Sequence, residues 1–449
     1  MSCPAPARGP AVLLLAAGLV AALAATPGAP APASLRAVAS YDAGIVDVAG
    51  VQVLRRLPGL GMAQVQGAPA ALSQLARTRG VRGVAPDDAV QLTGGSSTGT
   101  AVPAAHGLGG QAGKGDAGRG VRVAVLDTGV SDSAALDRRS GRLHDAFDAE
   151  GGEAPYEDGF GHGTFMATVL AGGPVDGPRG KAVGVAPGAT VLVVRIARPD
   201  GTTSLSRVLA GLDWVVRNAG SVDVANLSFS YSRPGTAYGA DPLTDAVERV
   251  RDAGVTVVVS AGNNPALVGD PGFTPQALTV GAAALADDPQ VAGFSGSGVV
   301  AGVAKPDVVA NGVGVLGVLP PQSVVALANP GARAGGALWR GTGTSQATAV
   351  TSGVAALLLE RQPDATPGEV KALLRASARP LPGRRDGAGL LRLARGNADG
   401  ADDPALGGRG ADPTGEGSFD ASSWSASSWS ASSWSASSWS ASSWSRKAP

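Results

Sequence analysis

Histidine is scarce in this chain of 449 residues, and only one of its three histidines stands in a setting that suits catalysis. His162 lies between two glycines, in the run Gly-His-Gly-Thr at 161–164, directly before an apolar helical stretch. A helix N-terminus disfavours the charged imidazolium, so we expect a neutral ring that could act as a general base. His106 and His144 lie among loop residues and are expected at the surface. Taken alone, His162 could also be a structural histidine.

Two side chains of the kind that cooperate with a histidine stand at the ends of expected elements. Asp127 ends the apolar run 121–126 and precedes Thr128-Gly129, and a carboxylate buried there needs a polar partner. Ser345 opens an apolar helix that runs to about 359, where the helix N-terminus would favour negative charge on the serine or its adduct. By themselves, Asp127 could be a turn or cap residue and Ser345 an ordinary N-cap.

A side-chain amide completes the set of reactive groups. Asn263 follows the apolar run 255–259 in Ala261-Gly262-Asn263, where it could be a turn residue or a donor to an oxyanion. Asn264 is the alternative donor if the register is shifted by one residue. The chain thus offers an acid, a base, a nucleophile and an oxyanion donor, each at a strand end or a helix start.

Buried strands that alternate with helices must position these groups. Apolar, largely β-branched runs at 121–126, 190–196, 222–226 and 255–259 predict strands, and helical spacing predicts helices over 205–216 and 243–253. A capping box, Thr366 to Glu369, predicts a further helix start. The pattern indicates an α/β fold with a mostly parallel sheet and helices on both faces. In such a fold the catalytic groups belong at the carboxyl ends of the strands.

The first 25 residues are typical of an export signal. Arg8 precedes an unbroken run of small and apolar residues, 11–25, which is too short for a comfortable membrane span. Residues 22–24 (Ala-Leu-Ala) offer a cleavage site. We therefore expect a secreted protein, extracellular or associated with the cell wall; the alternative is an uncleaved N-terminal anchor.

The segments on either side of the α/β region differ from it in pattern. Residues 35–93 form a small unit with a helix around 72–76 and a strand at 81–84. Residues 96–120 lack periodicity and are rich in Gly, Ser and Ala, so we expect an exposed linker or the start of a mature protein. After 395 come a Gly/Asp-rich linker (396–420) and a repeat tail (421–449).

The tail repeats the pentad Ala-Ser-Ser-Trp-Ser five times over residues 421–445. A period of five matches neither a helix face nor strand alternation, which favours a disordered segment. The alternative is a binding device, since exposed indole rings can stack on carbohydrate and several weak contacts add by avidity. The second reading predicts contact with a cell wall or polysaccharide.

Composition excludes several classes of function. The chain carries 36 basic and 36 acidic residues, so nothing favours nucleic-acid binding, which usually needs a basic face. Cys3 is the only cysteine, and no disulfide can form within the chain. A metal-dependent hydrolase built on His162 is disfavoured because no HExxH or paired-histidine spacing occurs.

Four motifs in this order resemble those of the subtilisin-like (subtilase) serine proteases. They are Asp127-Thr128-Gly129, His162-Gly163-Thr164, Ala261-Gly262-Asn263 and Gly343-Thr344-Ser345, supported by Gly184-Val185-Ala186-Pro187 and Asn226-Leu227-Ser228. The resemblance covers about 121–378 and implies a serine endopeptidase domain, which we place at 121–395. Residues 35–93 resemble, more weakly, the inhibitory propeptide of that family, which implies a propeptide at 26–95 and a mature start within 94–105.

The resemblance also implies the role of each group. Ser345 would attack the scissile carbonyl, His162 would move the proton, and Asp127 would hold the histidine tautomer. The Asn263 amide and the Ser345 N–H would hold the oxyanion. Substrate would lie as an added strand along the segment Ser228-Phe229-Ser230. Partners would then be protein or peptide substrates and the chain's own propeptide, and we expect a monomer.

Several positions depart from the usual family pattern. They are Phe165 and Thr168 after the histidine motif, Gln346 after the serine, Ala349 in the helix and Ser230 at the cleft. None removes a group that carries the chemistry, which needs no cofactor, although pocket shape is left open. The resemblance allows a structural calcium with Asp132 and Asp137 as candidate ligands, but no calcium-loop motif occurs. A catalytically silent binding protein that uses the repeat tail is the alternative function.

Overall fold

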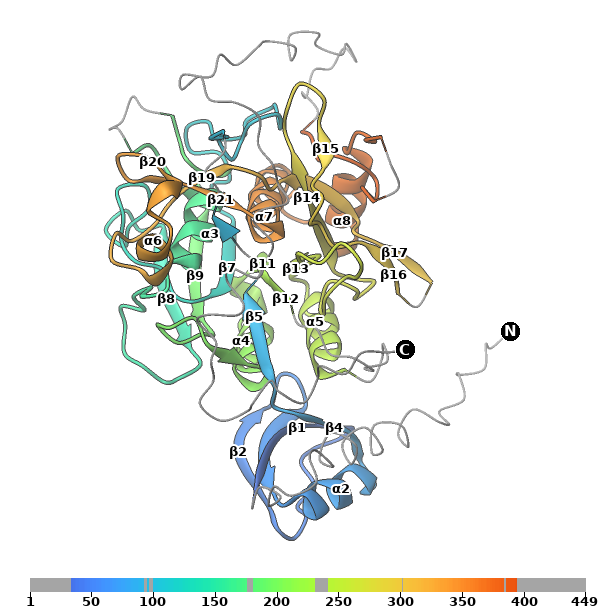
Figure 1. Ribbon diagram of the computed structural model, residues 1–449. Helices are drawn as coiled ribbons and strands as arrows, with labels where there is room; N and C mark the ends of the chain where they lie inside the picture. Colours follow the sequence, from blue (N-terminus) through green and yellow to red (C-terminus); the bar gives the residue numbers. More distant parts are fainter. Residues whose placement is uncertain are drawn as a thin grey trace, which may run out of the picture.

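The computed structural model describes residues 34–92, 95–96, 100–175, 181–230, 241–300, 302–382 and 385–393 (Figure 1). The predicted signal peptide, the linker at 396–420 and the repeat tail lie outside the described residues, so those expectations stay predictions.

The N-terminal unit is an antiparallel sheet with one helix against it. Its strands are β1 (Leu35–Tyr41), β2 (Val51–Leu57), β3 (Met62–Gly67) and β4 (Val81–Pro86), in the order β2-β3-β1-β4. Helix α2 (Pro69–Arg77) buries Leu72 and Leu75 against Val65 and its neighbours in the sheet. The helix around 72–76 and the strand at 81–84 are therefore confirmed.

A mostly parallel sheet forms the centre of the molecule. Its order is β15-β14-β13-β11-β7-β9-β8, with β18 paired to β14. The bounds are β7 (Arg122–Asp127), β8 (Leu143–Asp148), β9 (Thr190–Arg195), β11 (Val224–Leu227), β13 (Thr256–Ser260), β14 (Leu278–Ala284), β15 (Gln290–Val291) and β18 (Val308–Asn311). Every neighbouring pair is parallel except β14 with β15. The predicted sheet and its four expected strands are confirmed.

Helices cover both faces of this sheet (Figure 1). Along β7, Val123 and Val125 join the core with α3 (His162–Ala171) and α7 (Thr344–Arg361), whereas Ala124 and Leu126 join the core with α4 (Leu205–Arg217) and α5 (Pro242–Asp252). This alternation follows from the two-residue period of a strand. Helix α8 (Pro367–Ala376) begins at the predicted capping box of Thr366 and Glu369.

Short strands near the carboxyl edge of the central sheet form two further small sheets. Strand β5 (Ala89–Leu92) lies between β10 (Thr203–Ser204) and β12 (Phe229–Ser230). Strand β6 (Gly95–Ser96) pairs with β21 (Leu338–Thr342), which also pairs with β19 (Val315–Val318) and β20 (Arg333–Gly335). The remaining elements are the hairpin β16 (Gly298–Val300) with β17 (Val303–Lys305), helix α6 (Val324–Ala328), and the 3₁₀ turns η1 (Ala219–Ser221) and η2 (Pro330–Ala332).

The N-terminal unit packs on the α4–α5 face, at the lower end of Figure 1. Leu57, Leu60 and Met62 share one core with α4 and α5 residues such as Leu209 and Val247. No helix in the described part of the chain is long and apolar enough to span a membrane.

One expectation for the segment after β6 is wrong. Residues 100–120 are not an exposed linker, because Ala104, Leu108 and Ala117 are buried in the core of α3 and α7. The segment runs through successive turns, whose small residues pack without any helical or strand period. The alternative expectation, the beginning of a mature protein, stays a prediction.

Candidate active site

The end of β7 and the start of α3 bring an aspartate and a histidine together. His162 Nδ1 lies 2.8 Å from Asp127 Oδ1 and 2.9 Å from Oδ2, and both side chains are buried. Asp127 Oδ1 also accepts a hydrogen bond from the N–H of Thr128 at 2.8 Å. The carboxylate therefore holds the proton on Nδ1 and leaves the Nε2 lone pair available as a base. Nε2 is buried and has no hydrogen-bond partner among the described residues.

Glycines permit the close approach of the two loops. A Cβ at Gly163 would lie 2.1 Å from the carbonyl oxygen of Gly129, so only glycine fits there. Gly161, directly before the histidine, has φ of 105°, in the region that glycine favours. The small residues around His162 are thus required to bring the ring onto Asp127.

A second buried carboxylate, Asp158, fastens the histidine loop, and the sequence analysis did not single it out. Its Oδ1 accepts from the Thr128 hydroxyl (2.7 Å) and the Gly161 N–H (2.6 Å). Its Oδ2 accepts from the N–H (2.7 Å) and the hydroxyl (2.8 Å) of Thr164. Burial raises the pKa of Asp158, and these four hydrogen bonds oppose the rise. A polar turn residue just before a glycine is a common signal, so the sequence offered little to distinguish it.

Ser345 lies at the second position of α7, at the N-terminal end of that buried helix. Its Oγ donates to the carbonyl oxygen of Ser228 at 2.9 Å, and the Ser228 hydroxyl donates to the Ser345 carbonyl at 3.2 Å. In this conformation the Ser345 hydroxyl faces the Ser228 carbonyl. Catalytic hydrogen bonds often form only when substrate is bound, so rotation of this side chain toward His162 is the step that would activate it.

Asn263 is held against the start of α7 by its side-chain oxygen. Its Oδ1 accepts from the N–H of Thr344 at 3.0 Å and from the Thr344 hydroxyl at 2.9 Å. This contact brings the Asn263 side chain to the start of the helix that carries Ser345. Asn264, the alternative donor, is exposed, and its Oδ1 accepts from the N–H of Ala266.

The segment expected to bind substrate contains strand β12, and this strand is already paired with β5. Strand β12 pairs antiparallel with β5, with Phe229 opposite Leu92 and Ser230 opposite Gln91. The Phe229 side chain is buried in the α4–α5 core, so only its backbone can meet another chain. A Cβ at Gly262 would lie 3.2 Å from Ser230 Oγ, which puts Ser230 beside the Asn263 loop.

Comparison with known proteins tests the family that these features suggest. The family model described as "Subtilase family" matches residues 118–404, more than half of the chain. The chain belongs to the subtilase family. The α/β fold described above is the subtilisin-like fold.

Named subtilases resemble the chain over its central region. Serine protease AprX of Bacillus subtilis (strain 168) is 34% identical over 273 residues, which are 58% of this chain and 61% of AprX. Subtilisin of Bacillus pumilus is 30% identical over 277 residues, covering 59% of this chain and 86% of that subtilisin. Fervidolysin of Fervidobacterium pennivorans, described as a keratinolytic enzyme related to subtilisin, has a similar fold (TM-score 0.62, 24% identity, 80% of this chain and 60% of that one).

This subtilase accommodates its unusual residues through local contacts. A Cβ at Gly317 or Gly341 would lie 2.8 or 2.7 Å from the Phe165 ring, so these two glycines make room for the ring between β19 and β21. The Thr168 hydroxyl accepts from the N–H of Val318 at 2.9 Å and ties α3 to β19. Gln346 is buried, and its Oε1 has no hydrogen-bond partner in the described part of the chain.

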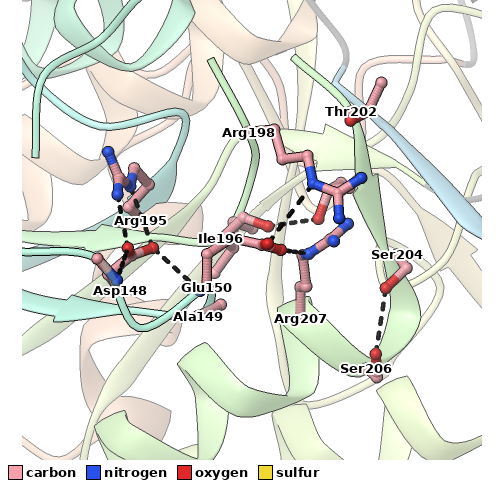
Figure 2. Close-up of polar contacts among 12 residues, drawn as sticks. Asp148, Ala149, Glu150, Arg195, Ile196, Arg198, Thr202, Ser204, Ser206 and Arg207 are labelled. Atoms are coloured by element: carbon pink, nitrogen blue, oxygen red, sulfur yellow. Dashed lines mark hydrogen bonds and ion pairs between the residues drawn. The ribbon is translucent and has the colours of Figure 1, made fainter. Parts of the chain in front are cut away.

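Ion pairs join the ends of β8 and β9 to the start of α4 (Figure 2). Arg195, opposite Asp127 in the β7–β9 register, binds Asp148 with both Nε (3.1 Å) and Nη2 (2.5 Å). Glu150 lies between Arg198, at 3.5 Å, and Arg207 at the start of α4. The ends of β8 and β9 and the start of α4 are therefore held as one support next to the active site.

The residues outside the site lie where their sequence context suggested. His106 and His144 are exposed, as expected. Of the two candidate calcium ligands, Asp132 accepts from Arg138 Nη1 at 2.8 Å and Asp137 accepts from the N–H of Ser140 at 2.7 Å. No group of three or more His, Cys, Asp or Glu side chains in the described ranges could hold a metal ion.

Proposed function

We propose that this subtilase is an endopeptidase that hydrolyses peptide bonds through an acyl-enzyme formed on Ser345. The observation that carries the proposal is the buried Asp127–His162 pair, which fixes the proton on Nδ1 and leaves Nε2 as the base. Ser345 Oγ attacks the scissile carbonyl carbon as its proton passes to His162 Nε2, and that proton then goes to the leaving amine. Water, deprotonated by the same nitrogen, releases the new carboxylate and regenerates Ser345.

The negative charge of the tetrahedral intermediate needs donors that are already in position. The Asn263 amide and the Ser345 N–H at the start of α7 would meet this charge at the positive end of a helix. Asp127 would stabilise the imidazolium that forms on His162.

Digestion of an unfolded protein substrate tests the proposed activity. We expect the wild-type protein to cut internal peptide bonds and Ser345→Ala or His162→Ala to lose about 10⁴-fold or more of that rate. Thr351→Val is a matched control, because Thr351 lies on the same buried helix and its hydroxyl donates to the carbonyl of Ala347 within that helix. Equal cleavage by wild type and Ser345→Ala would refute the proposal.

We also propose that residues 26–95 act as an inhibitory propeptide. Support comes from β5, which fills the space between the edges of β10 and β12 as a substrate strand would. Support also comes from β6, which pairs with β21 just before Ser345, with Gly95 opposite Thr342.

Polar contacts between the N-terminal unit and the helices beneath it support the same proposal. Asp87 accepts from the N–H of Ser206 at 2.8 Å, and so caps α4, whose own N-cap side chain makes no capping bond. Asp213 on α4 accepts from the N–H of Gly59 at 2.7 Å. Arg82 forms an ion pair with Asp245 on α5 at 3.0 Å.

N-terminal sequencing tests autocatalytic maturation. We expect the wild-type protein to begin at residue 93, 94 or 95, within or directly beside the predicted range, and Ser345→Ala to keep residues 34–92 attached. A trimmed Ser345→Ala protein would show that another protease performs the cleavage.

Export and the tail are the finer parts of the proposed function. The signal-like residues 1–25 support secretion, and the tryptophan pentads support contact with a cell wall or polysaccharide. Full-length protein and a deletion of 421–449 should therefore partition differently between cell wall and medium. Identical partition would refute a binding role for the tail.

A further inference from the structure

The resemblance to subtilases allows a bound calcium ion, and such an ion needs a site lined by oxygen atoms. Calcium takes six to eight oxygen ligands from carboxylates, carbonyls and water. Among the described residues, such oxygens cluster at two places. One surrounds Arg138, near the loop that follows Asp127, and the other surrounds Lys305, near the start of β14. In both places a side-chain cation already occupies the centre.

Arg138 fills the first site. Its Nη1 donates to Asp132 Oδ1 at 2.8 Å, and its Nη2 donates to the Val130 carbonyl at 2.9 Å. Its Nε and Nη2 each donate to one oxygen of Asp145 at 2.7 Å, in a bidentate pair. One guanidinium therefore binds two carboxylates and a carbonyl that follows the Asp127–Thr128–Gly129 turn.

The charges at this site suit a permanent internal cation. The Arg138 side chain is 20% exposed and that of Asp145 is 10% exposed. Burial alone would raise the pKa of Asp145, but the hydrogen bonds from Arg138 and from the N–H of Tyr156 lower it below its usual value. The bond to Asp145 in turn raises the pKa of Arg138. A metal ion could join this site only by displacing the guanidinium, since the two cations would repel each other.

Two lysines fill the second site. Lys305 Nζ donates to the Ala277 carbonyl at 3.0 Å and to Asp307 Oδ2 at 2.8 Å, and its side chain is 0% exposed. Lys371 Nζ donates to the carbonyls of Pro275 (2.6 Å) and Ala277 (2.8 Å) and lies 3.0 Å from Asp307 Oδ1. The two Nζ groups bind carbonyl and carboxylate oxygens that would otherwise be a ligand set for a hard cation. Burial lowers the pKa of Lys305 to about 7, so at higher pH its Nζ is a neutral donor to these oxygens.

We propose that Arg138 and the Lys305–Lys371 pair replace bound calcium at these two sites. Asp132 then fits an ion pair and does not fit a calcium site, which corrects its expected role as a ligand. The loop that follows the catalytic aspartate is held by a cation that chelators cannot remove. The proposal concerns stability and does not depend on the peptidase activity.

Removing the guanidinium should open the first site to calcium. We would compare thermal unfolding of the full chain in excess CaCl2 and in EDTA, in a Ser345→Ala background that prevents self-digestion. Arg138→Ala should unfold at a lower temperature in EDTA than the parent. CaCl2 at about 100 times its dissociation constant should raise its Tm by about 5 °C more than it raises the Tm of the parent.

Arg119→Ala is the matched control. Arg119 also pairs with an aspartate, Asp116, but it is 74% exposed and faces a single carboxylate. It should respond to CaCl2 no more than the parent does. Equal calcium responses of Arg138→Ala and the parent would overturn the proposal. If Arg138→Ala does not fold, Arg138→Gln is measured instead. A folded Arg138→Gln protein whose Tm rises in CaCl2 no more than that of the parent refutes the proposal as well.

Discussion

Replacing Asp158 with asparagine removes one acceptor oxygen from behind the catalytic histidine. The aspartate accepts four hydrogen bonds, two at each oxygen, and each oxygen receives one backbone N–H and one threonine hydroxyl. An asparagine keeps one oxygen and turns an NH2 group toward the other pair of donors. A hydroxyl can rotate to accept from that group, but a backbone N–H cannot.

The cost follows from that geometry. In either orientation of the amide, one buried N–H, of Gly161 or of Thr164, loses its acceptor, and a hydrogen bond to a charged group is lost. Together these should destabilise the protein by about 2–4 kcal/mol, or roughly 5–10 °C in Tm. Because Gly161 directly precedes His162, the ring should also shift. A displacement of roughly 1 Å costs about 100-fold in rate, so we expect kcat to fall about 10- to 100-fold with KM little changed.

Peptide hydrolysis well below the Tm of the variant separates positioning from stability. Asp158→Asn should show the loss in kcat at a temperature where circular dichroism finds it fully folded. Asp137→Asn is the control, since Asp137 accepts one exposed N–H outside the site, and it should stay within about twofold in kcat and about 1 °C in Tm. A folded Asp158→Asn protein with unchanged kcat would refute the positioning role, whatever its Tm.

Three further predictions follow from the same contacts. Asn263→Ala should lower kcat by about 10²–10³-fold in peptide hydrolysis, the loss known for one oxyanion donor in subtilisin, and an unchanged kcat would exclude the amide from the oxyanion site. Burial, opposed in part by Asp307, lowers the pKa of Lys305 to about 7. The unfolded chain then binds more protons between pH 7 and roughly pH 10, so stability should rise with pH there. The rise should be about 2 kcal/mol over two pH units, and urea unfolding of Lys305→Met should lose this slope. Hydrogen peroxide should inactivate Gln346→Met faster than wild type, because the thioether oxidises and the amide does not; equal rates would place that residue away from the reacting groups.

The sequence predicts the central sheet well because its strands are buried on both faces. A continuous β-branched run such as 121–126 has few other structures open to it, and the residue that ends it, Asp127, falls at the reactive edge. The candidate catalytic groups could be singled out for the same reason, since each stands where a regular element begins or ends. Asn263 meets Thr344 at the start of α7, whereas Asn264 bonds within its own loop, so the role proposed for Asn263 stays a prediction that geometry supports.

Features that depend on distant partners could not be predicted. Strands β5, β6 and β10 have only two to four residues each and exist because other edges pair with them. The burial of residues 100–120 comes from small side chains without periodicity, so no pattern marks it. Asp158 and Arg138 look like ordinary polar loop residues. Their roles come from carboxylates, hydroxyls and N–H groups that lie close only after folding.

Labelling with a fluorophosphonate probe tests the central claim most directly. The probe reacts with a serine hydroxyl only when a neighbouring base has activated it, so it reports the proposed chemistry at one atom. The mature wild-type protein should take up one equivalent on Ser345, located by peptide mass spectrometry, and Ser345→Ala should take up none. A folded, mature wild-type protein that does not label at Ser345 would contradict the account.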